Sequence, residues 1–182
     1  MSGNALSPGL PTGAVLWLTG LSSAGKTTLG RELATRLRAG GHRVELLDGD
    51  EMRQHLCRDL GFSRQDRDEH VRRLAYVAGL LARNGVVAVV CAISPYRAAR
   101  EAARQQAERF FEVFVNAPLE VCETRDVKGL YRKARAGLIQ GFTGLDDPYE
   151  APLQPDLECR TDQEDLEACA RRVLDCVCPI LG

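Results

Sequence analysis

One stretch near the N-terminus determines how the rest of the chain is organised: Gly20-Leu21-Ser22-Ser23-Ala24-Gly25-Lys26-Thr27-Thr28. It fits the pattern G-x-x-x-x-G-K-[ST]. The apolar run 14–18 before it is typical of a buried strand, and residues 28–37 after it have the pattern of a helix. In that context, backbone N–H groups and the helix N-terminus point at phosphate oxygens. A plain glycine turn is the alternative, but the complete pattern with both flanks favours binding of a nucleoside triphosphate.

The side chains of this loop have separable expected roles. Lys26 reaches the β- and γ-phosphates, and the Thr27 hydroxyl ligates Mg²⁺. The residues expected to contact the triphosphate are Gly20, Ser22, Ser23, Ala24, Gly25, Lys26, Thr27 and Thr28. The loop alone does not say what happens to the γ-phosphate.

The bulk composition indicates one globular domain. The chain has 182 residues, of which 45% are hydrophobic and 27% charged, and these values are ordinary for a single α/β domain. We expect a flexible tail over 1–12, rich in Gly, Pro and Ser, and a domain over 13–182. The net charge of −1 gives no electrostatic case for nucleic acid or membrane binding. No apolar run approaches the ~18 residues of a membrane span, and the tail lacks the features of a secretory signal.

The cysteines do not form a recognisable metal or disulfide pattern. There are seven, and no C-x-x-C pair occurs, which makes a zinc site an unfavoured interpretation. Free thiols suit a reducing cytoplasm. A redox role for Cys176 and Cys178 remains an alternative.

The rest of the chain alternates strand-like and helix-like segments. Further strands are expected at 43–47, 86–93, 110–115 and 156–160. Helices are expected at 51–58, from the Ser63 cap to Asn84, from Arg97 to about 109, from Pro118 onward, and at 163–177. This alternation predicts a mostly parallel sheet of about five strands with helices on both faces. Ligands bind at the carboxyl ends of such strands, which here carry Gly20, Asp48, Asp50, Ile93, Ser94 and Asn116.

The placement of carboxylates favours a kinase. The expected strand 86–93 has no aspartate at its end, and there is no Asn-Lys-x-Asp motif, so a motor ATPase or a GTPase switch is disfavoured. We expect Asp50 to orient or deprotonate an acceptor hydroxyl and to assist Mg²⁺ through water. The alternative is that Asp48 and Asp50 only cap the next helix.

Two further groups carry charge that suits phosphate. Residues 125–147 are basic and Gly-rich, and a mobile lid that closes over phosphates has this composition. A solvated helix face is the alternative. Arg67 and His70 lie three apart on one helical face and could bind an anionic acceptor, although the same residues also suit an ordinary surface helix start.

These segments together resemble the adenylylsulfate kinase (APS kinase) family from Trp17 to about Pro155. The resemblance rests on the phosphate loop and on later, more specific segments, which are Leu47-Asp48-Gly49-Asp50, Gly61-Phe62-Ser63, Arg72-Arg73, Ile93-Ser94-Pro95-Tyr96-Arg97, Pro118 to Glu123, Arg125 to Tyr131, Lys133 to Gly137 and Gly141-Phe142-Thr143-Gly144. It implies a three-layer P-loop kinase fold with a mobile basic lid. The implied reaction is phosphorylation of the 3′-hydroxyl of adenosine 5′-phosphosulfate (APS) by ATP with Mg²⁺, which yields PAPS in sulfate activation.

The resemblance also implies roles for individual residues. Phe62 and Phe142 sandwich the adenine of APS. The other residues implied to bind APS are Asp50, Arg53, Arg67, His70, Ile93, Ser94, Lys128 and Gly141. Those implied to border ATP beyond the phosphate loop are Arg125, Arg132, Arg160 and Thr161. Lys26, Asp50 and Lys128 are the catalytic candidates. Ser94 matches a serine proposed to form a phosphoserine intermediate, but direct in-line transfer needs only positioning, so substrate binding is the other interpretation.

The chain departs from the family at three positions of the site. The family usually has Gly where Ser23 stands and Asn where Glu51 and His70 stand. The resemblance further implies a homodimer, a separate ATP sulfurylase partner and a cytoplasmic location. Two alternative functions remain: a kinase of the same fold for another small hydroxyl acceptor such as a nucleoside or sugar acid, and a non-catalytic nucleotide-binding module.

Overall fold

The computed structural model describes residues 13–181, and the expected tail over 1–12 lies outside them. Its centre is a five-stranded parallel sheet in the order β2-β3-β1-β4-β5. The strands are β1 (Ala14–Thr19), β2 (Val44–Asp48), β3 (Val87–Cys91), β4 (Phe110–Asn116) and β5 (Leu157–Arg160). The predicted fold class, a parallel α/β sheet of about five strands, is confirmed.

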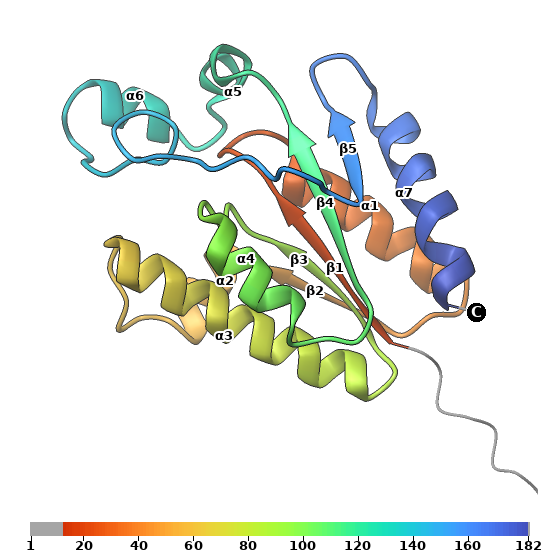
Figure 1. Cartoon of the computed structure of the whole chain (residues 1–182). Coiled ribbons are helices and arrows are strands. Elements are labelled where there is room, and N and C mark those ends of the chain that lie inside the picture. Colours follow the sequence, from red (N-terminus) through yellow and green to blue (C-terminus); the bar gives the residue numbers. More distant parts are fainter. Residues whose placement is uncertain (1–12, 182) are drawn as a thin grey trace, which may run out of the picture.

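Helices cover both faces of this sheet (Figure 1). They are α1 (Lys26–Ala39), α2 (Gly49–His55), α3 (Arg64–Arg83), α4 (Arg97–Arg104), α5 (Leu119–Arg125), α6 (Leu130–Arg135) and α7 (Leu166–Leu181). Apolar residues of α1 and α7 pack on one face, and those of α3 and α4 pack on the other. Every residue of β1 and β3 is buried, because the central strands of a two-sided parallel sheet have no solvent face.

Several element boundaries differ from the sequence prediction. Helix α4 ends at Arg104 rather than near 109, because the chain turns there and brings Gln106 against α3, where a Cβ on Gly79 would lie 2.4 Å from the Gln106 carbonyl oxygen. Helix α7 begins at Leu166, since the Asp165 side chain accepts from Ala168 N–H at 2.8 Å and caps it there. Pro118 precedes α5 as its N-cap instead of lying in the first turn.

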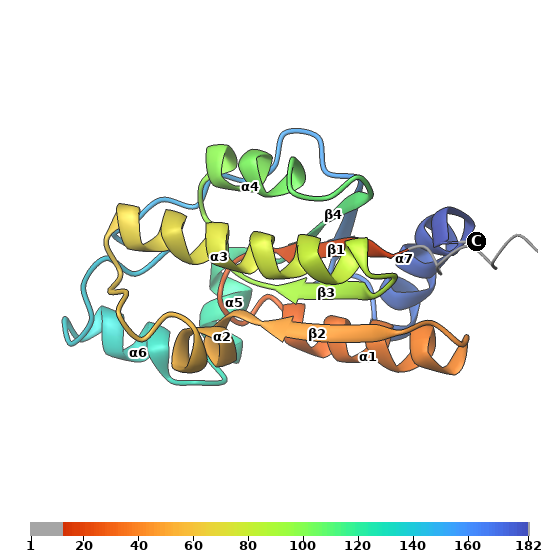
Figure 2. The ribbon, with the colours of Figure 1, turned by 90° about the horizontal axis from the view of Figure 1, so that it is seen from below.

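The segment expected to form a lid contains a short helix that the sequence pattern did not predict. Helix α6 and the chain that follows it pack over the phosphate loop, with Tyr131 1% and Thr143 2% exposed. Figure 2 shows α2, α6 and the first turns of α3 gathered at one end of the sheet. This end is where the carboxyl ends of β1, β2 and β3 lie, so it is the expected place for a site.

Among residues 13–181, no helix combines the length and the apolar character that a membrane crossing needs.

Candidate active site

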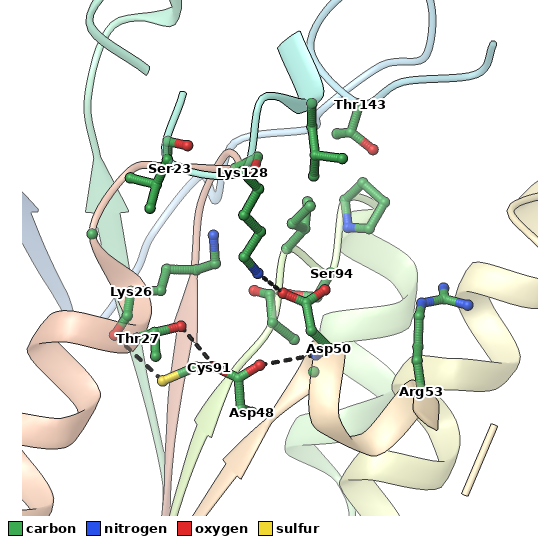
Figure 3. Close-up of a pocket in the computed structure, with 18 of the residues that line it drawn as sticks. Ser23, Lys26, Thr27, Asp48, Asp50, Arg53, Cys91, Ser94, Lys128 and Thr143 are labelled. Carbon is green, nitrogen blue, oxygen red and sulfur yellow. Dashed lines mark hydrogen bonds and ion pairs between the residues drawn. The ribbon is translucent and has the colours of Figure 1, made fainter. Parts of the chain in front are cut away.

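A cavity of about 1030 Å³ lies at the carboxyl ends of the strands, between the phosphate loop, α2, α3 and the lid segment (Figure 3). It brings together most of the residues predicted from the sequence. Those that line it are Ser22, Ser23, Gly25, Lys26, Thr27, Thr28, Asp50, Arg53, Phe62, Arg67, His70, Ile93, Ser94, Arg125, Lys128, Gly141, Phe142 and Thr161. Four predicted residues do not line it, which are Gly20, Ala24, Arg132 and Arg160.

The phosphate loop joins β1 to α1 in the predicted way. Gly20 has φ 152°, and a Cβ there would lie 2.2 Å from Val115 O, so only glycine fits this close turn. Gly25 has φ 104° and precedes the first residue of α1. Ser23 has φ 59°, in the left-handed region that favours glycine. Its presence therefore stores backbone strain at the site.

Lys26 lies within the loop and is nearly buried. Its Nζ donates to Gly20 O at 2.9 Å and to Leu21 O at 2.6 Å. Burial lowers the pKa of Lys26 to about 8, with the neighbouring Asp50 acting in the opposite direction. The ammonium therefore remains mostly protonated at neutral pH and can pair with phosphate oxygens.

The two aspartates at and just after the end of β2, Asp48 and Asp50, make different contacts. Asp48 Oδ1 accepts from Asp50 N–H at 2.9 Å and caps α2, while Asp48 Oδ2 accepts from the Thr27 hydroxyl at 2.7 Å. Asp48 is thus a helix cap and a site residue together. A hydroxyl and a carboxylate at this spacing are hard oxygen ligands, which Mg²⁺ prefers when substrate phosphates and water complete its shell. Thr27 and Asp48 therefore have the chemistry to hold Mg²⁺, whereas the sequence prediction gave Asp50, acting through water, as the second residue. Within 13–181, no group of three or more His, Cys, Asp or Glu that could hold a metal occurs.

Asp50 and Lys128 form an ion pair across the cavity (Figure 3). Lys128 comes from the chain between α5 and α6, while Asp50 comes from the first turn of α2. The Asp50 side chain is 66% exposed, so its carboxylate is open to an incoming hydroxyl. This pair places a base and a cation side by side, near Lys26 and Thr27.

Ser94 is held from inside the protein. Its Oγ accepts from Trp17 Nε1 at 3.0 Å and donates to Thr19 Oγ1 at 3.0 Å, and the residue is only 3% exposed. It also has φ 42°. These contacts occupy the hydroxyl and favour Ser94 as a fixed part of the loop after β3 over a phosphoserine intermediate.

The two predicted aromatic residues line one cavity but differ in packing. Phe62 is 65% exposed, and the guanidinium groups of Arg53 and Arg67 lie 4.8 and 5.7 Å from its ring centroid. Phe142 is buried and meets Tyr131 edge-on at 4.9 Å. Tyr131 also donates to Ser22 O at 3.0 Å, so Phe142 is fixed to the phosphate loop while Phe62 is free to adapt to a ligand.

Arg125 and Thr161 are in contact with each other in the cavity lining. Arg125 donates to Thr161 O at 2.6 Å, and Thr161 Oγ1 donates to Ala24 O at 2.7 Å. This chain of bonds ties the end of α5 and the loop after β5 to the phosphate loop. Of the residues predicted to border ATP beyond the phosphate loop, Arg125 and Thr161 lie together in the cavity lining. Arg132 and Arg160 lie outside that lining.

His70 is buried in α3, and its Nε2 has no hydrogen-bond partner within the described residues. Burial, with a contribution from Arg53, lowers the pKa of His70 to about 4 from its usual 6.5. The imidazole is therefore neutral at physiological pH. His70 is among the residues that line the cavity, and its Nε2 atom is itself buried.

The protonation of His70 leads to a prediction about stability. As pH falls below 6.5, the unfolded chain protonates this histidine first, so folding stability declines until pH is about 4. The free energy of unfolding falls by at most about 3 kcal/mol over this pH range. We expect His70→Asn to lose the part of this pH dependence that comes from His70. Urea unfolding at several pH values between 4 and 6.5 measures the free energy of unfolding of each variant. His55→Asn, at an exposed position on α2, should keep the wild-type dependence, and equal slopes for wild type and H70N would contradict the prediction.

Some cavity residues had no strong sequence signal. The sequence left Asp48 open between a cap of the next helix and a site residue at a strand end, and in the structure it caps α2 and also lines the cavity. Cys169 lines the cavity as well and had no sequence signal, whereas Thr143 lies in a segment of the family resemblance but was given no role of its own.

Comparison with known proteins agrees with this geometry. The sequence profile of the family described as adenylylsulphate kinase matches residues 12–160. An adenylyl-sulfate kinase of Picosynechococcus sp. is 59% identical over 162 residues, which cover 89% of this chain and 92% of that protein. The APS kinase of Mycobacterium tuberculosis, in a complex with AMPPNP and APS, superposes with a TM-score of 0.88 at 44% identity and covers 92% of this chain and 98% of its own. A hexameric APS kinase from Thiobacillus denitrificans superposes with a TM-score of 0.72 at 33% identity, over 94% of this chain and 30% of that one. This chain belongs to the adenylylsulphate kinase family.

Proposed function

We propose that the protein transfers the γ-phosphoryl group of ATP to the 3′-hydroxyl of APS and releases PAPS and ADP. One observation carries this proposal: a single cavity holds the phosphate loop, the Asp50–Lys128 pair and the ring of Phe62. A donor site, a transfer point and an aromatic acceptor site therefore share one cavity. The complex of the related M. tuberculosis enzyme with AMPPNP and APS supports the assignment of the two nucleotides.

The donor half consists of the phosphate loop and the Arg125–Thr161 contact. Backbone N–H groups of the loop hold the β- and γ-phosphates, and Lys26 neutralises their charge. Arg125 and Thr161 border the adenine of ATP. Thr27 and Asp48 are the residues that would hold Mg²⁺, which supplies charge neutralisation for the phosphates when it is bound.

The transfer point lies between the donor and acceptor halves. Asp50 accepts the proton of the acceptor 3′-hydroxyl as the oxygen attacks phosphorus. Lys128 places positive charge beside the transferring phosphoryl group, where negative charge is spread over the equatorial oxygens. The O–P bond to ADP breaks as the new O–P bond forms, and no covalent intermediate on Ser94 is needed.

The acceptor half rests on Phe62, Phe142 and two arginines. The exposed ring of Phe62 provides a stacking face for adenine, and Phe142 provides the opposite side. Arg53 and Arg67 supply cations for the phosphosulfate, and His70 lines the same part of the site. An aromatic clamp suits a purine, whereas a sugar acid makes no use of it.

The test is an assay of acceptor-dependent ADP release by purified protein with ATP and Mg²⁺. We expect APS to support turnover, and gluconate, shikimate and free adenosine to give rates near background. Turnover of one of these other acceptors without APS turnover would establish the same fold with another substrate. ATP binding without turnover of any acceptor would establish a non-catalytic nucleotide-binding module.

The same proposal extends to the location of the enzyme, the source of its APS and its oligomeric state. A cytoplasmic enzyme of sulfate activation receives APS from an ATP sulfurylase, which we propose to be a separate protein. We further propose a homodimer, which light scattering of the purified chain would distinguish from a monomer and from the hexamer named for the T. denitrificans relative.

A further inference from the structure

The lid turn over Gly141–Asp147 carries Phe142 and is closed by its own aspartates. The Asp146 carboxylate accepts from Gly141 N–H at 2.7 Å and from Phe142 N–H at 2.6 Å. Within the same turn, Gly144 N–H donates to Asp147 O at 2.8 Å. The turn therefore has a defined local shape, and its attachment to the rest of the protein decides where Phe142 lies.

The Phe142 ring packs on Tyr131, and Arg67 of α3 makes hydrogen bonds that attach the backbone of the turn. The residue is only 8% exposed, and its Nη1 donates to Thr143 Oγ1 at 2.9 Å while its Nη2 donates to Gly141 O at 2.5 Å. Its Nε donates to Phe62 O at 2.9 Å. A single guanidinium thus links the backbone beside Phe142 to the backbone of Phe62. These bonds engage three of its five N–H groups, so donors remain for an anion.

Two residues behind Arg67 fix its orientation. Asp147 Oδ2 lies 3.6 Å from Arg67 Nε and accepts from the Tyr96 hydroxyl at 3.0 Å. Tyr96 is 2% exposed, and the guanidinium of Arg64 lies 4.4 Å from its ring centroid. Burial and the bond to Asp147 raise the pKa of Tyr96, so the phenol keeps its proton and donates. Neither Tyr96 nor Asp147 lines the cavity.

We propose that Tyr96 and Asp147 are positioning residues for the acceptor nucleotide. They hold Arg67, and through Arg67 they hold the backbone of the Phe142 turn beside the backbone of Phe62. The inference rests on the proposed function, because it takes the acceptor base to lie between those two rings. Affinity for the acceptor then depends on a hydroxyl that never touches it, whereas ATP binds at the phosphate loop and does not depend on it.

The test is Tyr96→Phe, which removes the hydroxyl and keeps the ring. Since one hydrogen bond to a charged group is lost, we expect the KM for APS to rise by about fivefold to tenfold. The kcat and the KM for ATP should stay within about twofold of wild type. Tyr76→Phe is the matched control, because Tyr76 is 55% exposed on α3 and its change should leave all three constants unaltered. Thermal melting of each variant establishes that it is folded.

Asp147→Asn tests the same relay without altering Tyr96, and it should also raise the KM for APS selectively. If Tyr96 acts through Asp147, adding Y96F to D147N should raise this KM much less than Y96F does alone. An unchanged KM for APS in Y96F and D147N, equal increases in the KM values of both substrates, or fully additive effects would each overturn the proposal. Wild-type turnover of APS is measured first, so that failure of the proposed function is recognised separately.

Discussion

Replacing Asp50 with asparagine should slow phosphoryl transfer to APS by about two decades or more, while ATP binds nearly as well as to wild type. The structure gives the physical reason, because the Asp50 carboxylate is exposed to the cavity and paired with Lys128. Asparagine keeps the shape of the side chain and cannot accept the hydroxyl proton. Steady-state kinetics with APS and calorimetry with an ATP analogue measure the two parts separately.

Glu51 provides the control for this variant. It follows Asp50 in the same turn of α2, is exposed and does not line the cavity, so Glu51→Gln should retain wild-type turnover. Near-normal turnover by D50N would mean that Asp50 serves α2 only as a first-turn carboxylate.

Lys26→Ala should weaken ATP binding and lower the rate of transfer together, with a loss of about 10²–10³ in kcat/KM for ATP. Lys26 stands among the loop carbonyls of Gly20 and Leu21, where its charge is shielded from water and acts strongly on phosphate oxygens. Lys26 contacts the phosphates both in bound ATP and during transfer. Both the affinity for ATP and the rate of transfer should therefore fall. Wild-type ATP affinity in K26A, in a variant whose melting temperature is preserved, would contradict this assignment.

The parts of the fold that the sequence predicted are those whose pattern reflects burial. The runs at β1 and β3 are continuously apolar because both faces of the central strands are covered, and Ser63 caps α3 as its type suggested. Helix α6 was not predicted, because three of its six residues are charged and only Tyr131 is buried. Its position depends on contacts with the phosphate loop, which no local pattern records.

In the site, too, some residues were predictable from the sequence and others only from the assembled structure. The phosphate loop, Asp50 and Lys128 were identified from motifs and resemblance, and the structure gathers them in one cavity. The second bond of Asp48 to Thr27 depends on how β2 lies relative to α1, and the Tyr96–Asp147 contact joins residues 51 apart in sequence. Neither could be derived from spacing, because both arise only when the sheet and the lid are assembled.

The most direct test of the central claim follows labelled phosphate from ATP to its acceptor. The purified protein is incubated with γ-labelled ATP, Mg²⁺ and APS, and the position of the label is identified in the separated products. We expect the label to appear on the 3′-oxygen of APS, with one ADP formed for each PAPS. Label found only in inorganic phosphate, or at another position of the acceptor, would contradict it.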